Sequence, residues 1–151
     1  MTLCRDGVPV NRTWGRTSVF STVEAWETEL EGVLAALPAL AGFQGRLGEG
    51  AARLAEALGA RDDLARRAGR VMVYAEMSYA VETTDPAAVA LYGRAQAADA
   101  QVRAATAFIE PEVLALGRDR LRDWSVVEPT LVVDEHHVDD LHGLVVGDAQ
   151  P

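Results

Sequence analysis

The amino-acid sequence predicts an all-α fold, an antiparallel helical bundle of about five to six helices with an extended N-terminal arm. Apolar residues recur at steps of three and four along most of the chain, which is the spacing of one face of an α-helix. Residue combinations typical of helix starts precede several of these runs. The chain is 49% hydrophobic and 25% charged, a balance typical of a globular domain rather than a disordered one.

Three segments are expected along the chain. Residues 1–20 form an extended arm that lies against the helices through Trp14 and Phe20. Residues 21–146 form the helical domain, and residues 147–151 form a frayed tail. The arm is expected because this stretch contains several residues typical of loops, namely Gly7, Pro9, Asn11 and Gly15.

The first helix is expected to begin with a capping box. Ser21 and Glu24 are three residues apart, so each side chain can accept a hydrogen bond from a free backbone N–H group of the first turn. Pro38 is expected to stop or interrupt this helix. The apolar residues at helical spacing before it are Val23, Trp26, Leu30, Val33, Leu34 and Leu37.

A glycine-containing connector is expected to lead to two further helices. Residues 49–58 form a short helix that ends at Gly59, and the third helix spans about residues 61–82. Because the third helix has two apolar stripes, it is predicted to pack on both sides and to be central. One stripe comprises Leu64, Ala68, Val71, Ala75 and Ser78, and the other comprises Val73, Tyr74, Met77 and Val81.

The fourth helix has a strong start signal. Thr84-Asp85-Pro86 places a polar N-cap before a proline in the first helical turn. The seam of this helix is rich in alanine, which lets a neighbouring helix approach closely. Its members are Ala88, Leu91, Ala95, Ala98, Val102, Ala105 and Ile109.

The pattern changes toward the end of the chain. Glu110-Pro111-Glu112 is expected to restart a helix that continues to about Leu121. Val126-Val127 and residues 131–133 have the composition of strands, whereas residues 134–144 have a helical pattern.

Charge and residue usage exclude several classes of function. The net charge is −9, and the basic clusters around Arg66 and Arg120 are too small to offset it, so nucleic acid is not an expected partner. All 14 basic residues are arginine, which excludes Schiff-base chemistry and the lysine of phosphate loops.

No apolar run approaches the roughly 18 residues of a membrane span. Because Cys4 is the only cysteine and no secretory signal precedes Gly7, we expect a cytoplasmic protein.

The strongest candidate for a metal site lies near the end of the chain. His136 and His137 are adjacent, so a helix would point them roughly 100° apart, and His142 follows His137 by five residues. Zinc peptidases instead place two histidines at i and i+4 with a glutamate beside the first. His136 and Asp140 have that spacing but lack a third ligand. We therefore interpret residues 134–142 as a solvated acidic helix face, and we expect no metal site and no cofactor.

Other candidates for catalysis have simpler structural explanations. No sequence pattern pairs Cys4 with a histidine, because all three histidines lie near the opposite end of the chain. The glycine-containing connector follows a helix and contains no lysine, so it is interpreted as a flexible connector rather than a phosphate loop. Carboxylate pairs at Glu27 and Glu31 and at Glu110 and Glu112 are interpreted as solvated helix ends. The three tyrosines lie on apolar stripes and are expected in the core; they are Tyr74, Tyr79 and Tyr92. We expect no catalytic residue.

The order of these elements resembles the N-terminal helical domain of oligoendopeptidase F, a family of zinc-dependent oligopeptidases. The resemblance covers about residues 14–122 and extends more weakly to residues 136–141. The runs that carry it are Trp14, residues 24–30 (Glu-Ala-Trp-Glu-Thr-Glu-Leu), residues 43–47 (Phe-Gln-Gly-Arg-Leu), Tyr74, Tyr79, residues 83–85, residues 91–96 (Leu-Tyr-Gly-Arg-Ala-Gln) and residues 105–116.

The resemblance implies a lobe without catalytic residues. In the family, a His-Glu-x-x-His pair and a further glutamate bind zinc in the C-terminal part, and no position of this sequence matches them. The lobe would form one wall of a deep channel and limit access to short peptides. The chain is then a truncated or split gene product, an excised domain, or a stand-alone relative.

Two alternatives use the same residues differently. A free-standing helical interaction module would bury an exposed apolar face, with the third and fourth helices as its surfaces. A small metal-dependent enzyme would use His136, His137 and His142. The expected partners are a second copy of the chain or a separate peptidase catalytic half, and short peptides in a full-length enzyme.

Overall fold

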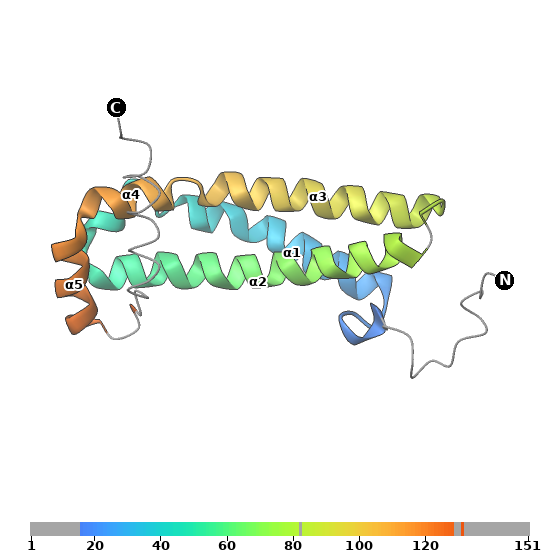
Figure 1. Cartoon of the computed structure of the whole chain (residues 1–151), viewed down its shortest axis with the longest axis horizontal. Helices are drawn as coiled ribbons and strands as arrows, with labels where there is room; N and C mark the ends of the chain where they lie inside the picture. Colours follow the sequence, from blue (N-terminus) through green and yellow to red (C-terminus); the bar gives the residue numbers. More distant parts are fainter. Residues whose placement is uncertain (1–15, 82, 129–130, 132–151) are drawn as a thin grey trace, which may run out of the picture. The chain divides into compact units, whose positions relative to one another are not determined.

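The computed structural model describes residues 16–81, 83–128 and 131, and Figure 1 traces them in chain order. All regular secondary structure in these residues is helical, which confirms the all-α prediction. The predicted helix count, antiparallel arrangement and domain boundaries stay predictions. The expected helix at residues 134–144, the tail and Trp14 lie outside the described residues. The helices are η3 (Arg16–Ser18), α1 (Val23–Ala41), η4 (Leu47–Glu49), α2 (Ala51–Val81), α3 (Pro86–Thr106), α4 (Ile109–Leu116) and α5 (Arg118–Val127).

Contacts along the chain group its residues into two compact units. Unit 1 comprises Met1–Ala35 and Arg66–Ala100, and unit 2 comprises Ala36–Ala65 and Gln101–Pro151. Each unit is therefore built from two stretches that are distant in sequence. Among the described residues, no helix combines the length and apolar character that crossing a membrane requires.

The N-cap of helix α1 lies one residue later than predicted. The hydroxyl of Thr22, not that of Ser21, accepts a hydrogen bond from the backbone N–H of Ala25, at 3.2 Å. Thr22 is therefore the N-cap, and the predicted capping box with Ser21 is wrong. Pro38 does not stop the helix, which continues to Ala41. A proline removes one backbone donor, and the buried side chains of this helix stabilise it on either side of that gap.

Helix α2 joins the two helices that were expected over residues 49–58 and 61–82. Gly59 does not end a helix but lies within α2. A single exposed glycine costs about 1 kcal/mol relative to alanine, which is too little to break a helix that buries Leu54 and Leu64 on either side of it.

The two predicted apolar stripes of this helix behave differently. The first stripe is confirmed, because all five of its residues are buried. In the second stripe Tyr74 is buried, but Val73 and Val81 are 44% and 51% exposed. The prediction that this helix packs on both sides is therefore wrong for the described residues.

Helix α3 begins as predicted. The Asp85 carboxylate accepts a hydrogen bond from the backbone N–H of Ala87 at 3.0 Å, and Pro86 is the first helical residue. The alanine-rich seam is buried from Ala88 to Val102. Small side chains on this face allow a neighbouring helix to approach closely.

Helices α4 and α5 replace the single helix expected to reach Leu121. Gly117 separates them, with a positive φ of 79° that favours glycine. Pro111 lies in the first turn of α4, as predicted. Val126 and Val127 are the last two residues of α5, so the strand-like interpretation of this pair is wrong.

Candidate functional surfaces

Unit 1 is organised around a buried tryptophan. Trp26 of α1 is completely buried, and its indole N–H donates to the backbone carbonyl of Val71 in α2 at 2.9 Å. The Trp26 ring stacks on Tyr74, with ring centroids 6.3 Å apart. Phe20 meets Tyr74 edge to face at 5.7 Å, so the predicted packing of Phe20 against the helices is confirmed. These aromatic contacts join α1 to α2 within unit 1.

Three arginines of unit 1 are directed toward α1 or the segment before it. Arg94 lies over the Trp26 ring at 5.2 Å and donates to the Glu27 carboxylate at 2.6 Å. Arg67 donates to Glu29 at 2.8 Å. Arg70 lies over the Phe20 ring at 4.9 Å. These cations are therefore engaged in packing α1, and Glu27 is an ion-pair partner rather than only a solvated helix end.

A second aromatic pair in unit 1 lies outside this core. Tyr79 of α2 and Tyr92 of α3 stack with ring centroids 5.0 Å apart and an interplanar angle of 10°. Both residues are half-buried, unlike Tyr74. The expectation of core tyrosines is therefore confirmed for Tyr74 and is too simple for the other two, which retain contact with solvent.

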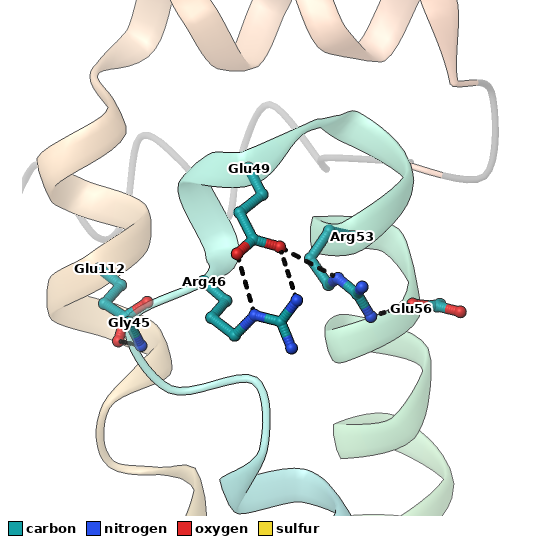
Figure 2. A network of polar contacts seen from close by, with 6 residues as sticks. All are labelled: Gly45, Arg46, Glu49, Arg53, Glu56 and Glu112. Atoms are coloured by element: carbon teal, nitrogen blue, oxygen red, sulfur yellow. Dashed lines mark hydrogen bonds and ion pairs between the residues drawn. The ribbon is translucent and has the colours of Figure 1, made fainter.

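The connector between α1 and α2 in unit 2 carries a network of polar contacts (Figure 2). The Glu49 carboxylate accepts hydrogen bonds from Arg46 at 2.9 and 3.1 Å. The same carboxylate lies 3.6 Å from Arg53, which also pairs with Glu56 at 3.0 Å. All four side chains are substantially exposed, so the network orders the connector without creating a desolvated reaction site.

Side chains from α4 and α5 also hold the connector. The backbone N–H of Gly45 donates to the Glu112 carboxylate at 2.6 Å, as Figure 2 shows. Arg120 donates to the carbonyl of Gly48 at 2.9 Å. Gly45 has a positive φ of 76°. We call this arrangement of Gly45, Gly48, Glu112 and Arg120 the connector clamp.

An apolar cluster lies with the clamp in unit 2. Leu47 of the connector is completely buried, and it belongs to one cluster with Ile109 and Leu121. The full set of buried residues in this cluster is Leu47, Leu54, Ala57, Ile109, Leu121 and Leu131. The connector is thus a packed element and not the flexible loop that its glycines suggested.

The electrostatics of the exposed carboxylates follow from their donors. The hydrogen bonds from Arg46, with the charges of Arg46 and Arg53, hold the pKa of Glu49 below its ordinary value. The same contact raises the pKa of Arg46. A backbone N–H and the Thr22 hydroxyl lower the pKa of Glu24 at the start of α1. Each of these carboxylates is favoured as an anion, which does not suit a general acid.

The structure describes the candidate carboxylates and tyrosines, whereas the candidate thiol and imidazoles lie elsewhere in the chain. Cys4, His136, His137 and His142 lie outside the described residues. Within the ranges that are described, no three potential ligands gather in a group able to hold a metal ion. Glu112 was interpreted as a solvated helix end, and its bond to Gly45 corrects that interpretation. The sequence carries no signal that would pair Glu112 with Gly45, because the two residues are 67 positions apart.

Comparisons with known proteins find relatives of this chain among bacterial oligopeptidases. Oligopeptidase PepF of Bacillus subtilis (strain 168) is 29% identical over 137 residues, which are 91% of this chain and 20% of PepF. Group B oligopeptidase PepB of Streptococcus agalactiae serotype III (strain NEM316) is 31% identical over 132 residues, which are 87% of this chain and 22% of PepB. The chain is homologous to part of the oligopeptidases PepF and PepB. No model of a protein family matches the chain.

A solved structure agrees with this assignment at the level of fold. The chain matches the crystal structure of oligoendopeptidase F from Enterococcus faecium with a TM-score of 0.74 at 24% identity. The match covers 81% of this chain and 24% of that structure. The chain thus spans about a fifth of the length of the relatives it matches in sequence.

Proposed function

We propose that this chain is the non-catalytic helical lobe of an oligoendopeptidase F-type zinc metallopeptidase, where it forms one wall of the channel that admits short peptides. The observation that carries this proposal is the uneven coverage of the matches, about nine-tenths of this chain but only a fifth of PepF and PepB. A lobe of this kind would be an antiparallel bundle of five to six helices in a cytoplasmic enzyme.

One feature of the sequence and one of the structure support a role without catalysis. The 151 residues contain no His-Glu-x-x-His motif, so the zinc ligands and the general base of such a peptidase would come from another part of the enzyme. The carboxylates of the described residues that have perturbed pKa values are paired with arginine or lie at a helix start. Both features suit a structural wall.

A chimeric enzyme tests the proposal directly. The segment of Bacillus subtilis PepF that matches this chain is replaced by this chain, and hydrolysis of short peptides is compared with hydrolysis of an unfolded protein. If the chain forms a channel wall, the chimera hydrolyses short peptides and spares the long substrate. A matched control carries an unrelated helical domain of equal length in the same place and is expected to be inactive.

Two outcomes would contradict the proposal. The first is a folded chimera that has no peptidase activity although its catalytic part binds zinc as PepF does. The second is hydrolysis of short peptides by this chain alone, in a manner that a chelator abolishes. The second result would favour the metal-dependent enzyme that uses His136, His137 and His142, and a His137→Ala variant would then lose both metal and activity.

A self-associating interaction module is a second candidate, and the exposed stripe on α2 favours it. Val73, Met77 and Val81 are spaced at i, i+4 and i+8, and the two valines are 44% and 51% exposed. Such a stripe can pack against a second copy of the chain. Light scattering over a range of concentrations would detect a dimer that a Val73→Ser, Val81→Ser variant loses. A Val126→Ser, Val127→Ser variant is the control, and a strict monomer would exclude this candidate.

A further inference from the structure

The stacked tyrosines of unit 1 form an aromatic surface that is partly exposed to solvent. Tyr74 fills the core with Trp26, whereas Tyr79 and Tyr92 keep part of their surface in solvent. Their rings are nearly parallel, with an interplanar angle of 10° and centroids 5.0 Å apart. Two such rings present electron-rich surface that can attract a cation.

The surroundings of Tyr92 leave this surface open. Val89, one helical turn earlier on α3, is 47% exposed. Gly93 follows Tyr92, and no heavy atom lies within 4 Å of the position that a Cβ atom would occupy there. The backbone of α3 at Gly93 is therefore exposed and open to the approach of a ligand.

The charge beside the pair is negative. Glu76 is exposed and lies three residues before Tyr79 on α2, which places the two on neighbouring positions of one helix face. Three arginines of the same unit are engaged elsewhere: Arg67 bonds to Glu29, Arg94 bonds to Glu27, and Arg70 bonds to the carbonyl of Val19. An aromatic pair beside a carboxylate complements a guanidinium or ammonium group.

We infer that Tyr79, Tyr92 and Glu76 form a subsite for a cationic side chain of a bound oligopeptide, with arginine as its preferred occupant. The guanidinium lies against the tyrosine rings and pairs with the Glu76 carboxylate, and the neighbouring peptide residue contacts Val89 and the exposed backbone at Gly93. The net charge of −9 attracts such a peptide from a distance. This inference rests on the proposed function, because it assigns a substrate preference to the channel wall.

Nuclear magnetic resonance titration of the full chain tests the subsite. The probe is a hexapeptide that repeats arginine, phenylalanine and glycine, and the control peptide has glutamate in place of arginine. The arginine peptide is expected to shift the backbone amide signals of Gly93 and Tyr79 in a saturable manner. Glu76→Gln and Tyr92→Leu variants are expected to bind it about two- to fivefold more weakly.

The controls separate a subsite from general electrostatic attraction. Glu31 is exposed on α1, so a Glu31→Gln variant has the same charge as Glu76→Gln and is expected to bind the peptide as the unchanged chain does. Glu76 is exposed, so its substitution leaves the fold intact even if Tyr92→Leu does not. The inference is overturned if the Gly93 signal does not move, if the glutamate peptide shifts it equally, or if Glu76→Gln and Glu31→Gln bind alike.

The outcome is independent of the chimera experiment. An active chimera built on a chain that ignores the arginine peptide would support the channel wall and overturn the subsite. Saturable binding in the isolated chain, together with a folded chimera that binds zinc but is inactive, would overturn the channel wall and leave Tyr79, Tyr92 and Glu76 as a peptide-binding surface without that role.

Discussion

The indole N–H of Trp26 donates a hydrogen bond to the backbone carbonyl of Val71, 45 residues away in the sequence, at 2.9 Å. Both residues are buried, so the bond satisfies the polar atom of the largest buried side chain in the described part of unit 1. The bond also fixes the register of α1 on α2, because a shift of either helix would leave the indole N–H without its acceptor.

A Trp26→Phe substitution is expected to destabilise the fold. It removes the bond to Val71 and part of a completely buried ring, which together should lower the free energy of unfolding by about 1–3 kcal/mol. Urea denaturation followed by circular dichroism measures this change. The control is Trp124→Phe, since Trp124 is only half-buried beneath Arg120; a loss as large as that of Trp26→Phe would contradict the central role of Trp26.

Leu47 is predicted to be the most sensitive residue of the connector. Its side chain is completely buried in the apolar cluster of unit 2, so Leu47→Ala should cost about 2–5 kcal/mol. The same denaturation measurement applies, with the exposed Val81→Ala as control. A cost below about 1 kcal/mol would show that the connector does not pack as an element of the core.

Substitution of glycine by alanine is expected to have opposite effects at two positions. Gly59 lies within α2 with nothing within 4 Å of a Cβ atom, so Gly59→Ala should stabilise by about 0.5–1 kcal/mol. Gly117 has a φ of 79°, so Gly117→Ala should destabilise by about 1–2 kcal/mol. Thermal unfolding of both variants checks the signs, and equal shifts would be inconsistent with the break between α4 and α5.

The connector network predicts a specific pH dependence. The pKa of Glu49 is lowered from its ordinary value of 4.5 by Arg46 and Arg53. The stabilisation by this carboxylate is therefore complete above pH 4.5 and is lost as the pH falls through the lowered pKa. Carbon-13 titration of the Glu49 carboxyl group should give a midpoint below pH 4.5. A midpoint at or above pH 4.5 would show that the network does not persist in solution.

The sequence predicted the helical elements well where one local signal was strong. Asp85 and Pro86 mark the start of α3 because capping depends on a few neighbouring residues. Gly59 and Pro38 do not end their helices, because local helix propensity differs by only a few kcal/mol and burial of the flanking apolar residues outweighs it. The strand-like interpretation of Val126 and Val127 is wrong for a related reason, because two β-branched residues also fit the end of a helix.

The candidate surfaces could be predicted only in part. An apolar stripe at Val73 and Val81 is visible in the sequence, but whether it is covered depends on tertiary packing. The connector clamp and the pairing of Tyr79 with Tyr92 join residues from different helices, and periodicity within one helix carries no information about such partners.

The reach of Glu112 back to Gly45 has a consequence for biosynthesis. During translation the connector emerges from the ribosome long before the carboxylate that holds it, and Arg120 follows later still. Such non-local contacts close slowly compared with helix formation. Until the later helices have been synthesised, Leu47 of the nascent chain therefore lacks its apolar partners from α4 and α5.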